Sequence, residues 1–321
     1  MKLVRLCAFA MGLVVCAHGL ARAEDHYPSR VMTIVVPLTP GTAIDIQARL
    51  YADALAKRFG YQVIVLNKAG AGTAIGAETV ANANPDGYTI LLTNSAHAML
   101  STMNKNLTFD PFADFAPIEL IAKAPSVVAV APSLGVHNLQ EFIALAKAKP
   151  NTINYGSAGI GTATHIAGAY FALQTGTQLV HVPYTVSQTI LTDLMAGHIQ
   201  VTFSPESFML PLLQDGKLLP LAVSDKEPVT EPIKIPTALS QGVDYISATW
   251  YGFLVPAKTP RDVQETLHAA IVEVGKDPEL QAKIRLLGFT PVDIGLGDFD
   301  AYLHSEMKRL GPLLATIGQS H

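Results

Sequence analysis

The chain has 321 residues, a formal net charge of −4 and 49% hydrophobic residues. The acidic balance argues against nucleic acid and anionic membrane surfaces as partners. The length suits one large domain or two of ordinary size. Beyond the first residues no segment is apolar for long enough to span a bilayer, so we expect a soluble protein.

Residues 1–23 predict a secretion signal. Lys2 and Arg5 give a basic start, an apolar run follows, and Ala21-Arg22-Ala23 has the pattern of a cleavage site. An uncleaved anchor is the alternative, but the apolar run is short and is interrupted by His18. Cleavage would remove both cysteines, so we expect a periplasmic protein without disulfides or cysteine chemistry.

Three strand–loop–helix units are predicted at the start of the mature chain. Residues 32–36 read as a buried strand, and apolar residues at helical spacing from Ile44 to Phe59 predict a helix. Thr42 and Asp45 form a capping pattern at its start. Repetition of this unit with short connections predicts a parallel sheet with right-handed crossovers. The next two units comprise strands 63–66 and 89–93 and a helix over 74–82.

Two apolar runs then predict a crossing to a second lobe. Residues 118–122 and 127–131 read as two extended strands separated by residues 123–126. Asn138 and Glu141 form a capping box for a helix that reaches about Lys149. The strand–loop–helix cycle then restarts, with strands at 152–155, 179–182, 199–203 and 218–223.

A long strand at 249–256 predicts the return crossing, and three helices follow it, at 261–276, 278–287 and 299–314. We therefore expect an α/β protein of two lobes, each with a doubly wound, mostly parallel sheet. The predicted division is a signal peptide at 1–23, a first lobe at 24–125 plus 250–321, and a second lobe at 126–249.

Six loops follow the carboxyl ends of the predicted strands, where open parallel sheets bind ligands. Together they contain one acidic residue, Glu206, and one basic residue, Lys68. Gly, Pro, Ser, Thr and Asn dominate the rest, which favours anion binding through backbone amides and hydroxyls over acid–base catalysis. Ordinary turns, rich in Gly and Ser for conformational reasons, are the alternative. The loops span 37–42, 67–73, 94–97, 156–162, 183–187 and 204–207.

Enzyme, cofactor and metal interpretations fit the motifs less well. The run Gly156-Ser157-Ala158-Gly159 has the wrong spacing for a nucleophile elbow. The glycine-rich run from Gly70 to Gly76 has its third glycine one residue too late for a dinucleotide fingerprint. The histidines show no ligand-pair spacing, so we expect no metal and no cofactor. A secreted α/β hydrolase with Ser95 or Ser157 beside a histidine is the alternative of a different class.

Short motifs recur in order along the mature chain: Tyr27-Pro28-Ser29-Arg30, Val36-Pro37, Pro40-Gly41 through Asp45, Pro85-Asp86-Gly87-Tyr88-Thr89, Gly156-Ser157-Ala158-Gly159 with Gly161-Thr162 and His165, His181-Val182-Pro183-Tyr184, and Trp250-Tyr251-Gly252. In the order of these motifs the chain resembles the Bug (TctC-like) family, which are periplasmic solute-binding proteins of tripartite tricarboxylate transporters. The resemblance implies a type II Venus-flytrap fold, in which loops 37–42 and 156–162 close on a small carboxylate for delivery to membrane permease subunits. The chain departs from the family pattern at Thr42 and at Thr185-Val186, so citrate specificity is not carried over.

The loops and the resemblance together predict a monomeric periplasmic receptor, not an enzyme. A dicarboxylate or an aromatic acid such as terephthalate suits neutral donors around an apolar spacer. An amino acid is the alternative if Glu206 faces the cleft, a nicotinate-like compound is another, and a sensor presenting the ligand to a membrane kinase would share the site. His165 would either donate to the ligand or bond to neighbouring backbone. We expect no catalytic residue and no metal ligand. The predicted ligand-binding residues are Leu38, Thr39, Gly41, Thr42, Ala43, Asn94, Ser95, His97, Ser157, Ala158, Gly159, Gly161, Thr162, His165, Tyr184, Thr185, Ser204 and Glu206.

Overall fold

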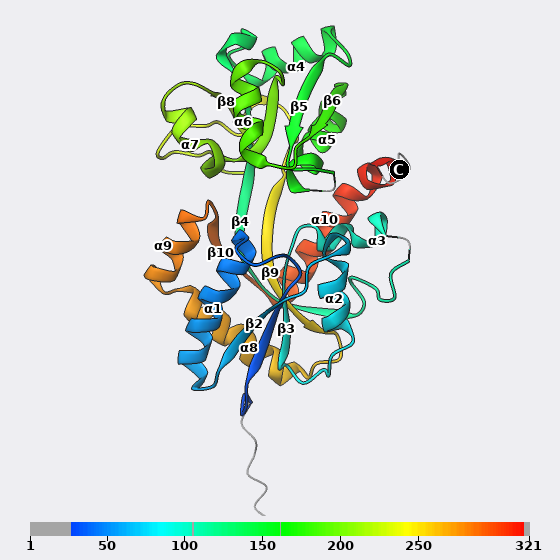
Figure 1. Cartoon of the computed structure of the whole chain (residues 1–321), viewed down its shortest axis with the longest axis vertical. Coiled ribbons are helices and arrows are strands. Elements are labelled where there is room, and N and C mark those ends of the chain that lie inside the picture. The colour runs from blue at the N-terminus through cyan, green and yellow to red at the C-terminus, as the bar shows by residue number, and fades with distance from the viewer. Residues whose placement is uncertain (1–26, 105, 161, 318–321) are drawn as a thin grey trace, which may run out of the picture.

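The computed structural model describes residues 27–104, 106–160 and 162–317, so the predicted leader lies outside the described part. One lobe contains the parallel strands β2, β1 and β3 and the antiparallel strand β9 (Figure 1). β1 is apolar at every position except Thr33, which suits a strand with both faces covered: α1, α8 and α9 pack on one side, and α2 and α10 on the other. The elements of this lobe are β1 (Met32–Val36), α1 (Ala43–Phe59), β2 (Val63–Asn67), α2 (Ala74–Ala81), β3 (Thr89–Asn94), β9 (Ala248–Pro256), α8 (Arg261–Gly275), α9 (Pro278–Leu286) and α10 (Leu296–Ile317).

The other lobe repeats the same construction. β5 pairs in parallel with β6 and β7, while α4 and α5 cover one face and α6 and α7 the other. The Asn138 cap predicted for α4 is confirmed, because Asn138 Oδ1 accepts a hydrogen bond from Glu141 N at 2.9 Å, although the backbone N–H that bonds to the Glu141 carboxylate is that of His137 and not that of Asn138. The elements of this lobe are α4 (Leu139–Ala148), β5 (Ile153–Ser157), α5 (Ala163–Thr175), β6 (Leu179–Pro183), α6 (Ser187–Ala196), β7 (Val201–Pro205), α7 (Glu206–Gln214) and β8 (Leu219–Val223).

Strand β4 (Phe115–Val130) connects the lobes, and β9 returns beside it (Figure 1). The two strands predicted at 118–122 and 127–131 are in fact one strand of 16 residues, so that prediction was wrong. Residues 123–126 stay extended because β9 pairs with β4 as far as Pro125 and β7 pairs with it from Ser126 onward. A single ten-stranded sheet therefore runs through both lobes.

Six elements of the described structure were not predicted from the sequence. Three are the 3₁₀ helices η1 (Ala71–Thr73), η3 (Pro132–Leu134) and η4 (Leu239–Gln241). Strand β10 (Thr290–Gly295) pairs antiparallel with β4, the 3₁₀ helix η2 (His97–Met99) follows β3, and α3 (Leu100–Met103) follows η2. α10 also begins three residues before the predicted start at Phe299. None of the described helices is long and apolar enough to cross a membrane. The two-lobed α/β fold is confirmed, while the residue boundaries of the lobes stay a prediction.

Candidate functional site

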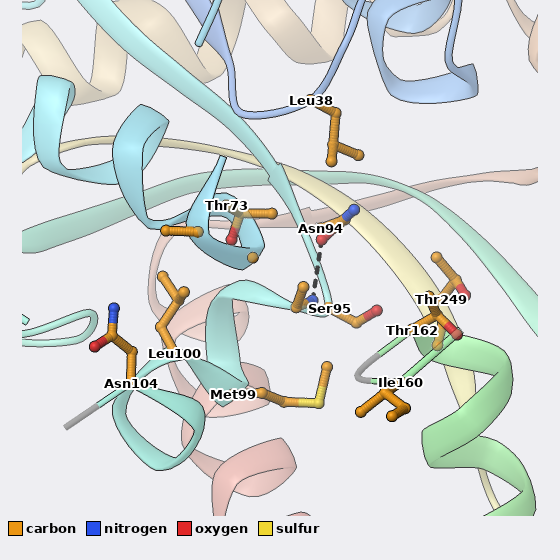
Figure 2. Close-up of a pocket in the computed structure, with 14 residues that line it drawn as sticks. Leu38, Thr73, Asn94, Ser95, Met99, Leu100, Asn104, Ile160, Thr162 and Thr249 are labelled. Carbon is orange, nitrogen blue, oxygen red and sulfur yellow. Dashed lines mark hydrogen bonds between the residues drawn. The ribbon is translucent and has the colours of Figure 1, made fainter. Parts of the chain in front are cut away.

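A cavity of about 500 Å³ lies at the carboxyl ends of β1, β2, β3 and β5, with residues of both lobes in its wall. Four of the six predicted loops contribute to it. The wall consists of Leu38, Ala71, Gly72, Thr73, Asn94, Ser95, Ala96, Met99, Leu100, Asn104, Ile160, Thr162, Ala163 and Thr249 (Figure 2). All of these side chains are aliphatic or neutral and polar.

Two asparagines supply amide donors at this cavity. Asn94 Oδ1 accepts a hydrogen bond from Ala96 N, and Asn104 Oδ1 accepts one from Asn106 N, each at 3.0 Å. A backbone N–H can only donate, so both side-chain oxygens are engaged as acceptors, and no partner among the described residues occupies either NH₂ group. Ser95 adds a hydroxyl to the wall. These donors favour a ligand that accepts hydrogen bonds, such as a carboxylate.

Two helices begin at the cavity, one in each lobe. Thr162 is the N-cap of α5, where its hydroxyl accepts a hydrogen bond from His165 N, and Ala163 is the first residue of that helix. Thr73 immediately precedes α2. The free N–H groups at a helix start carry partial positive charge and stabilise an anion by roughly 0.3–1 kcal/mol per helix. Because the two starts belong to different lobes, an anionic ligand that reaches both would hold the lobes together.

Apolar side chains line the space between these polar groups. In Figure 2, Leu38 and Met99 lie on opposite sides of the cavity, and Leu100 and Ile160 lie toward its two ends. Ile160 is half exposed, with 50% of its surface accessible, so a bound ligand could cover it. Burial of apolar ligand surface here would contribute about 25 cal/mol per Å². The site therefore suits a carboxylate with a hydrocarbon body.

The loop after β5 is held by its own hydrogen-bond network. Ser157 Oγ lies 2.6 Å from His181 Nε2, Ala158 N donates to Thr164 Oγ1 at 3.0 Å, and Thr162 Oγ1 donates to Gly159 O at 2.7 Å. The rings of His165 and His181 stack with centroids 4.0 Å apart. Burial lowers the pKa of His181. A neutral ring avoids burying charge against its neighbour, and the network holds in place the loop that carries Ile160 and Thr162.

The loop after β1 is held by Asp45. Its carboxylate accepts hydrogen bonds from Gly41 N at 2.9 Å, from Arg49 and from Asn67. Burial acts to raise the pKa of Asp45, but the hydrogen bonds from these groups outweigh it and lower the pKa. The predicted side-chain cap by Thr42 is wrong, because its hydroxyl donates to Thr39 O at 2.9 Å instead of bonding to the helix.

The predicted site residues divide into two groups by position. Leu38, Asn94, Ser95 and Thr162 line the cavity. Gly161 lies outside the described residues. The others do not line this cavity, and most lie in the loops beside it: Thr39, Gly41, Thr42, Ala43, His97, Ser157, Ala158, Gly159, His165, Tyr184, Thr185, Ser204 and Glu206.

Several members of the second group have partners within the protein. His97 is fully buried with Nε2 2.8 Å from Pro111 O, Tyr184 donates to Asp193 at 2.6 Å, and Ser204 is fully buried beside Thr202. Glu206 lines a separate cavity of about 550 Å³, which also contains Arg285 of α9. Burial raises the pKa of Glu206.

Sequence reasoning missed several residues of the wall. Ala71, Gly72 and Thr73 lie in the candidate loop 67–73, but none of its residues is among the predicted ligand-binding residues. Met99, Leu100 and Asn104 lie in the unpredicted η2–α3 segment and just after it. The Gly70-Ala71-Gly72-Thr73 run was the available signal for the first group. No sequence signal marked Met99, Leu100 and Asn104, because α3 is too short for its periodicity to be recognised.

The serine–histidine pair does not form an accessible nucleophile. Ser157 contacts His181, but the residue is 0% exposed. Ser95 lines the cavity, yet the neighbouring His97 points to Pro111 O. The described residues contain no group of three or more His, Cys, Asp or Glu side chains that could hold a metal ion. The arrangement is suited to binding.

Comparison with known proteins gives consistent matches over the chain. A family model described as "Tripartite tricarboxylate transporter family receptor" matches residues 47–319. A UPF0065 protein from the TAR-I ttuE-ttuC' intergenic region of Agrobacterium vitis is 30% identical over 304 residues, which cover 94% of this chain and 88% of that protein.

Two solved structures extend the comparison to the fold. A TctC solute-binding protein from Polaromonas, solved without ligand, has a TM-score of 0.83 at 27% identity, with 90% of this chain and 99% of that one covered. A protein from R. palustris solved with adipate has a TM-score of 0.72 at 29% identity, with 91% of this chain and 98% of that one covered.

Proposed function

The chain belongs to the TctC family of tripartite tricarboxylate transporter receptors, which are periplasmic solute-binding proteins, and we propose that it binds a small organic carboxylate between its lobes and delivers it to the membrane permease subunits of such a transporter. The ligand we favour is a dicarboxylate or an aromatic acid, such as terephthalate. The predicted export signal at residues 1–23 agrees with a periplasmic receptor.

One observation carries this proposal: the cavity combines a wall of neutral donors with a helix start from each lobe. The donors of Asn94, Asn104 and Ser95 suit carboxylate oxygens, and the aliphatic side chains between them suit a hydrocarbon spacer. The relative from R. palustris was solved with adipate, which has this combination. Because Glu206 lines another cavity, we place carboxylates ahead of amino acids.

Binding would favour closure of the lobes. A ligand that touches both lobes stabilises the closed state by the difference between its affinities for the closed and open states. β4 and β9 are the segments that would bend, because they connect the lobes. Closure would give the permease a surface that distinguishes the loaded receptor from the empty one.

A thermal-shift screen of the mature protein tests this function. The compounds are adipate, succinate, terephthalate, benzoate, nicotinate, glutamate and, as an uncharged control, 1,6-hexanediol. A ligand at a hundred times its dissociation constant stabilises the folded state by about 2.7 kcal/mol, which is readily measured. We expect a rise in Tm with at least one dicarboxylate or aromatic acid and none with hexanediol. Stabilisation by glutamate alone, or by the uncharged diol alone, would contradict the proposal.

A further inference from the structure

Polar side chains lie at both ends of the cavity and also between them. Figure 2 shows Thr162 and Thr249 at one end, beside the start of α5, and Thr73, directly before α2, toward the other end, where Asn104 follows α3. Asn94 and Ser95 lie between these ends, with Leu38 and Met99 on opposite sides of the cavity. A ligand that fills this space meets polar groups at both ends and the apolar side chains of Leu38 and Met99 along its middle.

Thr73 has an unusual environment at its end of the cavity. It is 3% exposed, and its hydroxyl oxygen is buried without a hydrogen-bond partner among the described residues. A buried hydroxyl without a partner destabilises the folded state, so such groups are normally paired with protein, water or ligand. The wall position of Thr73 makes a ligand acceptor the natural partner.

The backbone around Thr73 is also specialised. Gly70, Ala71, Gly72 and Thr73 all have positive φ, and at Thr73, a β-branched residue, φ is 89°. A β-branched residue in this region is strained, and such strain clusters at binding sites, where the surrounding structure maintains it. The turn includes the 3₁₀ helix η1 (Ala71–Thr73) and places Thr73 in the cavity wall directly before α2, while the N–H of Ala74, the first residue of α2, bonds to Ala71 O.

Asn104 completes the donor set at this end. The backbone N–H of Asn106 occupies its side-chain oxygen, and its NH₂ group has no partner among the described residues, so it can donate to a ligand. We propose that Thr73, Asn104 and the start of α2 form a second carboxylate subsite, so that the receptor selects diacids whose two carboxylates are joined by an apolar spacer. This selectivity rests on the proposed function, with the first carboxylate at the start of α5.

Isothermal titration with matched six-carbon acids tests the subsite. Adipate has a carboxylate at each end and hexanoate at only one, so wild-type protein should bind adipate at least tenfold more tightly. Thr73→Val keeps the branched shape and removes the hydroxyl. It should weaken adipate binding about tenfold, the effect of losing a hydrogen bond to a charged group, and change hexanoate binding less than twofold. Thr73→Ser should retain adipate binding.

Thr79→Val is the matched control. Thr79 lies on α2 outside the cavity, with its hydroxyl bonded to Ile75 O, and its loss should leave both affinities unchanged. Equal weakening of both acids by Thr73→Val would show a structural role and overturn the subsite. Wild-type affinity for hexanoate equal to or above that for adipate would also overturn it, while leaving the proposed function intact. Absence of binding to any carboxylate in the screen would overturn both.

Discussion

The surroundings of His97 show that it is a buried residue of the core and not part of the cavity wall. It follows β3 in a loop whose residues 94–96 line the cavity, which makes it a candidate ligand contact. Its ring is instead fully buried, 5.0 Å from the ring of Phe115 and with Nε2 2.8 Å from Pro111 O. Burial lowers the pKa of His97 to about 4, although the bond to Pro111 acts in the opposite direction.

This burial predicts a pH-dependent stability. Above pH 6.5 the histidine is neutral in both folded and unfolded chains and contributes no pH dependence. Between pH 6.5 and 4 the unfolded chain binds a proton that the folded protein does not, so stability falls as the pH falls. The contribution at pH 5 is a loss of about 2 kcal/mol.

Urea unfolding of the wild type and His97→Gln at pH 7 and pH 5 measures this contribution. Glutamine keeps an N–H donor for Pro111 and cannot titrate. We expect the variant to lose about 2 kcal/mol less than the wild type over this range. Identical losses in the two proteins would show that His97 is not the titrating group.

At the scale of elements, two helix starts with similar sequences differ in structure. In both, the carboxylate three residues after the N-cap accepts a bond from the N–H that precedes the N-cap, Glu141 from His137 N at 2.8 Å and Asp45 from Gly41 N at 2.9 Å. The N-cap side chains differ, because Asn138 Oδ1 accepts from Glu141 N whereas the Thr42 hydroxyl donates to Thr39 O. Asp45 is also held by Arg49 and by Asn67, which is distant in the sequence.

Alanine substitutions test whether the N-cap side chains of α4 and α1 contribute differently to stability. Asn138→Ala leaves the Glu141 N–H without its partner and should lower the free energy of unfolding by about 1 kcal/mol. Thr42→Ala is the comparison, because the Thr42 hydroxyl caps no helical N–H, and it should change stability by less than about 0.5 kcal/mol. Chemical denaturation of both variants checks the difference; a larger loss in Thr42→Ala would refute the assignment.

At the scale of the whole molecule, α10 joins the lobes a second time, apart from β4 and β9. It belongs to the first lobe, but Arg309 near its end donates to Ile246 O and lies over the ring of Tyr170 in α5, 4.7 Å from the ring centre. Arg309 Nη2 also lies 2.6 Å from Glu306 Oε1, and Glu306 is buried. The pair therefore neutralises a buried charge at the contact between the lobes.

Arg309→Ala should lower the free energy of unfolding by about 3 kcal/mol, because it leaves Glu306 buried without a cation. Adding Glu306→Gln to this variant removes the uncompensated charge and should restore part of the loss. Calorimetric unfolding of the single and double variants measures both effects. Wild-type stability in Arg309→Ala would show that the contact between the lobes contributes nothing.

The sequence by itself determined the features that depend on neighbouring residues. Apolar spacing identified α1 and β1, Asn138 and Glu141 marked the start of α4, and the glycine-rich run after Ser157 marked a loop that lines the cavity. These signals are local because helix periodicity, capping and turns involve residues a few positions apart.

Only the tertiary structure decided what depends on distant segments. β4 is continuous because β9 and β7 pair with it from far away in the chain, and β10 exists because β4 offers it an edge. The cavity wall also depends on segments that are distant in the sequence. Thr73, Met99 and Thr249 come together through the sheet, whereas Tyr184 does not line the cavity and its hydroxyl donates to Asp193. No local pattern records such pairing, because its energy comes from contacts that form only when the chain is folded.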